Sequence, residues 1–262
     1  MEIVHNELHK VREWFCVSKL LLNLSKTASI LFRTPNRQPD PSIHTINFCG
    51  TDVPLCHSVK FLGVFIDSHL TWNDHIQSIS KTISKNIGII ARLRHFLPRK
   101  TLVNLYNTLI NQYLSYSALL WGGSYCSKIY PLLILQKRAL RLKINYQLQH
   151  SPRDPFAKLN ILPVFDIYRY QVGIFMYSWI WNTLPNIFRF TFQFRHETHT
   201  HLTRARNSLS IPAFRLTSSQ QTLRFTGPCL WNSLPPKIQS CNSKYSFKKS
   251  LKSYLMDKYR RP

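Results

Sequence analysis

Acidic residues are scarce in this sequence: 11 Asp and Glu stand against 35 Lys and Arg, which gives a formal net charge of +24 in 262 residues. Such an excess of one sign repels itself in the compact state and is typical of a protein that binds a polyanion. Nucleic acid is the polyanion we expect, because neutralised phosphates release counterions and supply non-specific affinity. Compositional drift in an unselected sequence is the alternative explanation.

Cysteine pairs with metal-binding spacing are also missing. No Cys-x-x-Cys occurs among the six cysteines, which excludes the usual structural zinc sites and favours reduced cytosolic or nuclear thiols. The cysteines are Cys16, Cys49, Cys56, Cys126, Cys229 and Cys241. His196, His199 and His201 are close in sequence, but Glu197 is the single carboxylate among them and no cysteine is near, so we expect a solvated loop and no metal site.

Long apolar runs, a secretory leader and common catalytic motifs are absent as well. The most apolar run, Val172–Trp181, is too short to cross a bilayer, and the first residues lack a basic-then-apolar pattern. We therefore expect no membrane partner, no secretion, and a cytoplasmic or nuclear location. Neither a Gly-x-x-x-x-Gly-Lys phosphate loop nor a Gly-x-Ser-x-Gly elbow is present.

The hydrophobic content of 44%, with 13% aromatic residues, is that of a folded protein. The spacing of apolar residues predicts a helix over 7–19, followed by strands over 28–33, 43–48 and 59–66, with a turn at 50–52. From residue 71 the periodicity becomes helical. The predicted fold class is α+β and mainly α: a helix on a small antiparallel sheet edge, then a helical bundle and a basic helical or irregular C-terminal region.

Isoleucines and leucines in steps of three and four predict a long helix from about residue 71 to 97, with Lys81, Lys85 and Arg92 on another face. Further helices are predicted over 100–119, 129–144, 167–181 and 247–259. The third helix of the bundle carries Lys137, Arg138 and Arg141. Prolines near residue 151 suggest a boundary, so we predict regions 1–70, 71–150 and 151–262, with a flexible stretch over 195–222.

Several ordered segments resemble the reverse transcriptase of non-LTR retrotransposons of the jockey-like type. The segments are 7–15, 14–27, 61–63 with Asp67, Leu70–Trp72 and His75, 121–122, 135–139, 227–235 and 247–249. The resemblance implies an RNA-directed DNA polymerase ancestor. In this comparison 1–70 matches the edge of the palm with the primer grip, and 71–150 matches the thumb.

The resemblance also implies roles for single residues. Lys26 takes the place of a motif lysine near the phosphates of the incoming nucleotide, although a solvated loop lysine explains it as well. Phe61, Leu62 and Gly63 take the place of the primer grip, where a missing side chain lets a nucleic-acid backbone come close. A core strand with a glycine bulge is the alternative for these three residues.

The metal-holding half of such a polymerase is not in this sequence. The family enzyme holds two Mg²⁺ ions with carboxylates that include an Asp-Asp pair, and here no two acidic residues are adjacent. Asp67 and Asp74 are better explained by turn and helix-cap duties. We therefore expect no intact catalytic site, no cofactor for the chain alone and no polymerase activity on its own.

Two further hypotheses stand beside that of a nucleic-acid-binding fragment of a reverse transcriptase. For the fragment, Lys81, Lys85, Arg92, Lys137, Arg138 and Arg141 are the expected phosphate contacts on an RNA–DNA or DNA duplex, against the alternative of solvated helix faces. The second hypothesis is an interaction subunit that docks on a complete element-encoded polymerase or a host partner. The third is a pseudogene-like product without a role.

Overall fold

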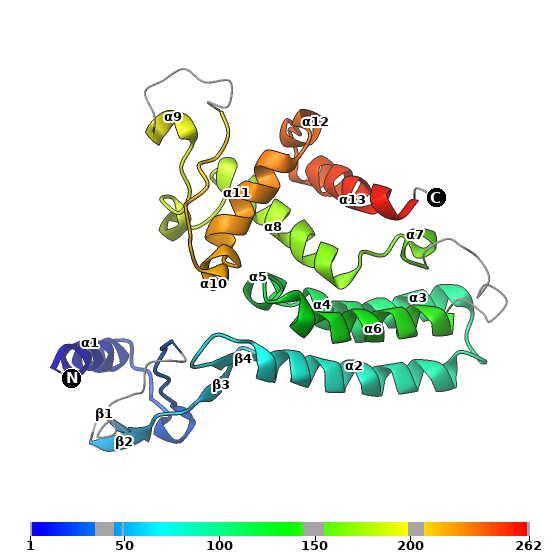
Figure 1. Ribbon diagram of the computed structural model, residues 1–262. Coiled ribbons are helices and arrows are strands. Elements are labelled where there is room, and N and C mark those ends of the chain that lie inside the picture. The colour runs from blue at the N-terminus through cyan, green and yellow to red at the C-terminus, as the bar shows by residue number, and fades with distance from the viewer. Residues whose placement is uncertain (1, 35–44, 49, 144–154, 199–206, 261–262) are drawn as a thin grey trace. The chain divides into compact units, whose positions relative to one another are not determined.

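The computed structural model describes residues 2–34, 45–48, 50–143, 155–198 and 207–260 (Figure 1). The fold is α+β and mainly helical, as predicted, and it divides into two compact units, Met1–His75 and Ile76–Pro262. The predicted boundary near residue 150 falls in 144–154, outside the described residues, and the three-region division stays a prediction. Within the predicted flexible stretch, 199–206 also lies outside the described residues.

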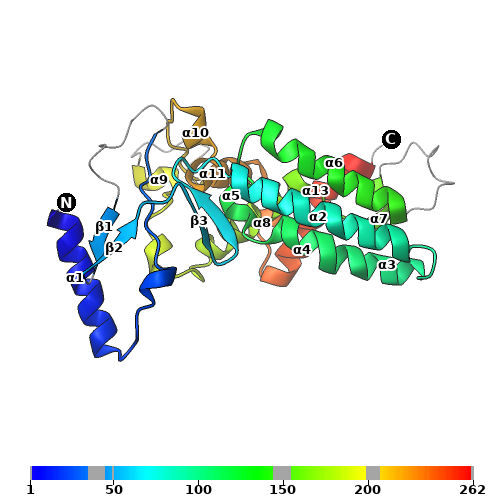
Figure 2. The same cartoon turned by 90° about the horizontal axis from the view of Figure 1, so that it is seen from below.

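The first unit consists of one helix, a 3₁₀ turn and two β-hairpins (Figure 2). The elements are α1 Glu2–Val17, η1 Leu24–Lys26, β1 Thr45–Phe48, β2 Thr51–Pro54, β3 Ser58–Phe61 and β4 Val64–Asp67. In the first hairpin β1 pairs antiparallel with β2, with Ile46 opposite Val53, and α1 packs against β1. Phe48 and Val53 are the buried apolar residues of these two strands.

The prediction of one strand over 59–66 is wrong, because this segment folds back on itself. β3 and β4 pair antiparallel with Phe61 opposite Val64, which leaves Leu62 and Gly63 as a two-residue turn. Both turn residues have positive φ, 45° and 84°, and this backbone matches the right-handed twist of a hairpin. Gly63 adopts it freely, whereas Leu62 does so against the steric preference of an L-residue. The glycine is therefore part of a turn and not of a bulge.

The predicted strand over 28–33 is also wrong. Only Ser29 forms a β-bridge in this segment, with Leu55, and Cys56 N donates to Ser29 O at 2.8 Å. Arg33 N donates to Ser68 O at 3.0 Å, so the segment is extended and anchored without a continuous ladder.

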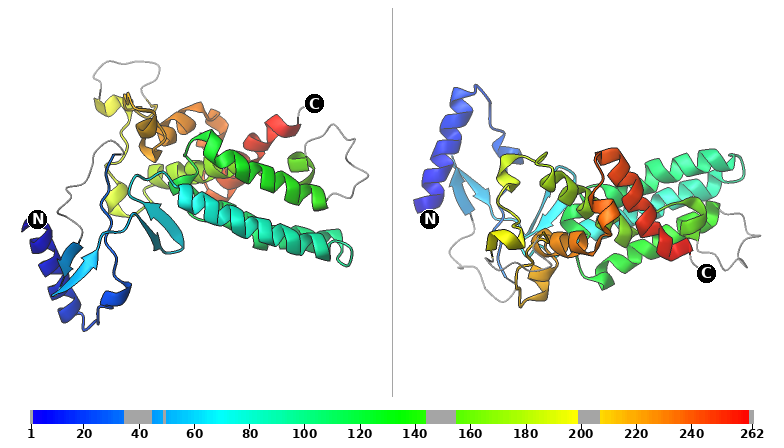
Figure 3. Two further views of the ribbon diagram at one scale, coloured as in Figure 1. Left: turned by 60° about the horizontal axis from the view of Figure 1, so that its bottom comes forward. Right: turned by 90° about the horizontal axis from the view of Figure 1, so that it is seen from above.

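The second unit is helical in the parts that the structure describes (Figure 3). Its elements are α2 Asn73–Leu93, α3 Arg99–Tyr106, the π-helix η2 Asn107–Asn111, α4 Gln112–Ser115, α5 Ala118–Trp121, α6 Cys126–Lys143, α7 Pro155–Leu159, α8 Val164–Ile180, η4 Asn186–Phe188, α9 Arg195–Thr198, α10 Thr217–Gln220, α11 Leu223–Ser233, α12 Pro236–Gln239 and α13 Lys244–Arg260; α2 begins in the last residues of the first unit. None of the helices in the described ranges combines the length and the apolar character that a bilayer crossing requires.

The long helix α2 follows its predicted pattern. Its buried face is made of isoleucines: Ile76, Ile79, Ile83, Ile87 and Ile90. The carboxamide of Asn86 donates to Leu109 O at 2.6 Å and so ties α2 to η2. The apolar stripe therefore sets which side of α2 faces the bundle, and the opposite side is left to solvent.

The helix predicted over 100–119 is interrupted. A π-helical turn, Asn107–Asn111, follows α3, and the chain bends again where Ser117 takes the left-handed conformation at φ 51°. Trp121, at the end of α5, is fully buried and donates its Nε1–H to Tyr116 O at 3.0 Å. The bend therefore places a large aromatic side chain in the core.

Helix α8 is the centre of the second unit and packs against α4, α5, α6, α11 and α13. Gly173 allows α13 to come close, because a Cβ atom at this position would lie 2.5 Å from Cδ2 of the fully buried Leu251. The buried Gln136 of α6 fixes the entry to α8: its Nε2 donates to Leu162 O at 2.9 Å, and its Oε1 accepts from Val164 N at 2.9 Å. These contacts hold the α7–α8 segment against α6.

Candidate nucleic-acid interface

The exposed side of α2 carries three of the predicted phosphate contacts. At 100° per residue, Lys85 lies about 40° and Arg92 about 20° around the helix from Lys81. All three side chains are exposed, opposite the isoleucine face. None of them makes an ion pair or hydrogen bond with a residue in the described part of the chain. Gly88 lies on the same stripe, with open space where a Cβ would stand. The lysine and arginine charges on this face are thus available to an anion.

A second basic face lies on α6. Arg138 and Arg141 are exposed and Lys137 is half-buried, and none of the three has an ion-pair partner among the described residues. Tyr130 and Ile134 precede Arg138 in steps of four, so they share its side of the helix, and they are 54% and 52% exposed. Sequence reasoning missed these two residues, although the spacing from Arg138 is a readable signal. An exposed aromatic ring beside arginines can stack on a base.

The three residues predicted to grip a primer lie at the tip of the second hairpin. Phe61 is 61% exposed and Leu62 is 74% exposed, so the tip presents apolar side chains to solvent. Lys60 Nζ lies 5.6 Å from the centroid of the Phe65 ring, on the strand opposite. The arrangement combines a projecting turn, an apolar tip and one cation.

Lys26 ends the 3₁₀ turn η1 and is exposed. Its backbone N donates to Asn23 O at 3.1 Å, and the same oxygen accepts from Thr27 Oγ1 at 2.9 Å. Lys26 lies in the same unit as the hairpin tip, but no hydrogen bond or ion pair of the described residues joins the two. The structure leaves Lys26 as a solvated lysine on an ordered turn, and its role beside nucleotide phosphates remains a prediction.

The carboxylate of Asp67 is occupied by backbone donors. It accepts from the amide nitrogens of His69 at 3.1 Å, Thr71 at 2.9 Å and Trp72 at 2.7 Å. Burial raises the pKa of this carboxyl, but the amide donors outweigh burial and hold the pKa below 3.8. Asp67 thus orders the turn that precedes α2, and Asp74 is an exposed residue in the first turn of that helix.

Metal-ligand residues do not gather in the described parts of the chain: no group of three His, Cys, Asp or Glu residues there could hold an ion. His199 and His201 lie outside the described residues. His196 stacks on Phe194 with a centroid distance of 5.3 Å, which accounts for its position without a metal.

Half of the chain is similar to a protein of a transposon. Over 139 residues it is 23% identical to a probable RNA-directed DNA polymerase from the transposon X-element of Drosophila melanogaster. The matched part is 51% of this chain and 15% of the length of that relative. No family model matches the chain, and no solved structure matches it. This likeness supports a reverse-transcriptase-like relationship, in line with the segments described above.

Proposed function

We propose that the chain is a piece of a mobile-element reverse transcriptase that binds nucleic acid without sequence preference. The observation that carries the proposal is the exposed face of α2, on which Lys81, Lys85 and Arg92 have no carboxylate partner among the described residues. Cations in such a row suit the regularly spaced phosphates of a duplex backbone, and phosphate contacts carry no sequence information. The net charge of +24 and the similarity to a transposon polymerase support it further.

In this proposal α6 supplies a second set of contacts, with Arg138 and Arg141 on phosphates and Tyr130 against a base. The tip of the β3–β4 hairpin approaches a strand end as a primer grip does. Phe61 and Leu62 provide apolar contact to a sugar or base, and Gly63 lets the backbone come near. Both an RNA–DNA hybrid and a DNA duplex offer the phosphates that these residues require.

The proposal includes no polymerase activity for the chain alone. Polymerisation requires carboxylates that hold two Mg²⁺ ions at the primer terminus. The carboxylate of Asp67 is bound by three backbone amides, and that of Asp166 by Arg169, Lys258 and Tyr259. Both are engaged in holding the fold, and no two acidic residues are neighbours in the sequence. We therefore expect Mg²⁺ to be bound by the intact family enzyme and not by this chain alone.

A binding titration with the whole chain tests the proposal. Fluorescence anisotropy of labelled RNA–DNA and DNA duplexes of several sequences is expected to give similar affinities that fall steeply as salt rises. Primer extension with Mg²⁺ and nucleotides is expected to give no product. If the chain binds no duplex even at low salt, nucleic-acid binding is contradicted. An affinity that does not depend on salt would contradict binding through phosphate contacts. Extended primers would contradict the absence of activity.

A second candidate function is docking on a complete polymerase or a host partner. Helix α1 favours it, because three of its apolar side chains are exposed to solvent: Val11 is 42%, Trp14 59% and Val17 83% exposed. Large exposed apolar groups in a row are typical of interaction surfaces. Sedimentation of the purified chain, alone and mixed with a complete polymerase, distinguishes this candidate. Self-association or co-sedimentation with the polymerase supports docking. A monomer that does not co-sediment with the polymerase argues against it.

A further inference from the structure

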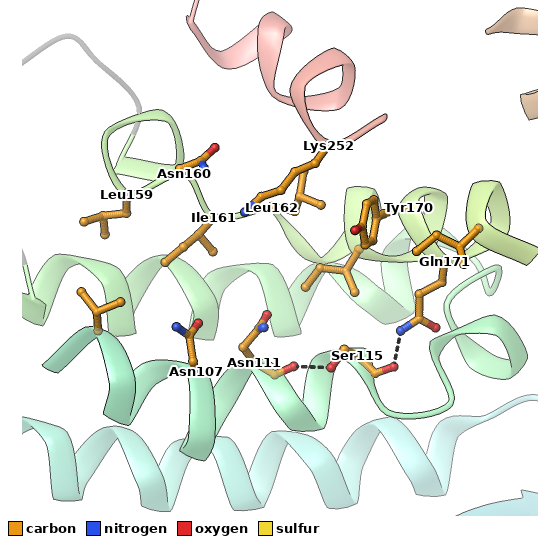
Figure 4. Close-up of a pocket in the computed structure, with 13 residues that line it drawn as sticks. Asn107, Asn111, Ser115, Leu159, Asn160, Ile161, Leu162, Tyr170, Gln171 and Lys252 are labelled. Atoms are coloured by element: carbon orange, nitrogen blue, oxygen red, sulfur yellow. Dashed lines mark hydrogen bonds between the residues drawn. The ribbon is translucent and has the colours of Figure 1, made fainter. Parts of the chain in front are cut away.

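A pocket of about 470 Å³ opens in the second unit, and none of the cations predicted on α2 and α6 is among its lining residues (Figure 4). Three segments that are distant in the sequence form its walls: the α3–η2–α4 helix, the end of α7 with α8, and α13. The lining residues are Val103, Asn107, Asn111, Ser115, Leu159, Asn160, Ile161, Leu162, Ile167, Tyr170, Gln171, Ile174 and Lys252. The volume is in the range of small-molecule pockets, roughly 300–1,000 Å³.

One wall of the pocket is a row of residues four apart: Val103, Asn107, Asn111 and Ser115. In an α-helix, four residues advance about 40° beyond one turn, so a row of this spacing drifts around the helix. The π-helical turn η2 takes in more residues per turn and offsets this drift. The interruption of the helix therefore keeps the row facing one side, where Asn107 and Asn111 point toward the segment 159–162 (Figure 4).

The two asparagine side chains on this wall have unused hydrogen-bonding capacity. Neither Asn107 nor Asn111 makes a side-chain hydrogen bond with any residue that the structure describes. Their neighbours hold the wall in place: Ser115 Oγ donates to Asn111 O at 2.8 Å, and Gln171 Nε2 donates to Ser115 O. The wall is fixed, while each free carboxamide presents a donor and an acceptor side by side.

The remaining walls are apolar, aromatic and basic. Leu162 and Ile167 are buried, and the ring of Tyr170 is partly exposed at the side of the pocket. Burial raises the pKa of Tyr170, so its hydroxyl is neutral at pH 7. Among the described residues of the lining, Lys252 is the cation and none is acidic. A ligand with a flat polar-edged ring and a negative group matches these walls in shape, hydrogen bonding and charge.

We propose that this pocket binds one unpaired nucleotide of a nucleic-acid strand, which deepens the proposed function and rests on it. Asparagine pairs with the neighbouring donor and acceptor of a base edge. Tyr170 packs on the base face, and Lys252 attracts the adjoining phosphate. A base inside a duplex cannot enter the pocket, because it is stacked and paired. The site therefore selects strands with an unpaired end or a gap, whereas the basic face of α2 takes any duplex.

The test compares a blunt duplex with the same duplex carrying a three-nucleotide overhang that contains 2-aminopurine. The overhang is expected to raise the affinity of the whole chain about tenfold, as for a stacked base, and to change the 2-aminopurine fluorescence. In the Asn107→Leu/Asn111→Leu variant the overhang gain disappears and the affinity for the blunt duplex is unchanged. Asn104→Leu is the matched control, since Asn104 is exposed on α3 and does not line the pocket. Urea unfolding of each variant confirms its fold.

Equal binding of blunt and overhanging duplexes, or a gain that survives in the double variant, overturns the proposal. A second measurement does not depend on duplex binding. Addition of deoxyadenosine monophosphate is expected to shift the side-chain amide NMR signals of Asn107 and Asn111 and to leave those of Asn104 in place. If the signals do not move, nucleotide binding in this pocket is overturned. If they shift although the chain binds no duplex, the proposed function fails and nucleotide binding in the pocket is kept.

Discussion

The ammonium group of Lys258 lies 2.9 Å from Oδ1 of Asp166, a residue 92 positions earlier in the chain. The Asp166 side chain is fully buried, and it also accepts hydrogen bonds from Arg169 Nη1 at 3.1 Å and from the hydroxyl of Tyr259. One carboxylate thus joins α8 to the C-terminal helix α13. This joint also holds the helix that brings Lys252 to the pocket lined by Asn107 and Asn111.

Replacing Asp166 by asparagine is expected to lower the free energy of unfolding by about 2–4 kcal/mol. The amide keeps the shape of the side chain but loses the buried negative charge that binds Arg169, Lys258 and the hydroxyl of Tyr259. Urea unfolding measures the change. Asp52→Asn is the control, because Asp52 is exposed and the hydrogen bond that it accepts from Asn47 can also be accepted by an amide oxygen, and we expect less than about 0.5 kcal/mol there. Equal effects of the two substitutions would rule out a special role for Asp166.

The stability of the protein is expected to fall in mild acid because of His75. This side chain is 3% exposed, its Nδ1 lies 3.4 Å from Phe65 N, and burial lowers its pKa from 6.5. Below pH 6.5 His75 takes up a proton in the unfolded chain but not in the folded protein. The free energy of unfolding therefore falls as the pH is lowered from 6.5 to the lower pKa of folded His75. The contribution is complete above pH 6.5 and amounts to at most about 1.4 kcal/mol per pH unit.

Urea unfolding at several pH values between 5 and 8 measures this dependence. In the His75→Gln variant the slope is expected to be smaller, because the remaining histidines and carboxylates still titrate. Identical slopes for the two proteins would show that His75 does not couple folding to pH.

The turn of the β3–β4 hairpin contains strain that one substitution can relieve. Leu62 has φ 45°, which costs an L-residue about 1–2 kcal/mol, and asparagine accepts this conformation more readily. Leu62→Asn is expected to raise the free energy of unfolding by about 1 kcal/mol. Gly63→Ala, at φ 84°, is expected to lower it. Chemical unfolding measures the change in the free energy of unfolding for both variants. A destabilised Leu62→Asn and a stabilised Gly63→Ala would mean that the turn has another geometry.

Gly88 is expected to separate stability from binding. It lies inside α2 on an exposed face, with no atom within 4 Å of a Cβ placed there. Gly88→Ala should therefore raise the free energy of unfolding by up to about 1 kcal/mol. The added methyl group lies between Lys85 and Arg92, so duplex affinity is expected to fall in this more stable protein. Anisotropy titrations together with urea unfolding measure both effects, and a gain in both would place the duplex elsewhere.

Periodicity predicted the helices well where one face is buried. The isoleucines of α2 are in the core as expected, and the predicted cations stand on the opposite side. The same reasoning failed at residues 59–66, because the turn consists of Leu62 and Gly63. Leucine is not a turn-forming residue, and an apolar run with a single glycine is the pattern of a strand. Local sequence could not show that this leucine accepts a left-handed backbone.

The candidate sites differ in how far sequence can predict them. The basic face of α2 depends on a spacing within one helix and was predicted residue by residue. The pocket could not be predicted, since its walls come from residues 103–115, 159–174 and 252, which only the packed fold brings together. Its π-helical turn also has no signature in the sequence. Three asparagines in its lining are unremarkable until the structure shows that they share one pocket.

Neutralising the exposed face of α2 tests directly whether its cations bind a duplex. The variant Lys81→Gln/Lys85→Gln/Arg92→Gln is compared with Lys237→Gln/Lys244→Gln/Lys249→Gln, which removes three other exposed lysines and the same charge. Binding of an RNA–DNA duplex is measured against salt concentration for both variants and the unaltered chain. The α2 variant is expected to lose affinity, and its salt slope is expected to fall by about one for each phosphate contact removed, while the control keeps most of its affinity and slope. Equal losses in the two variants would contradict it, because net charge alone would then explain binding.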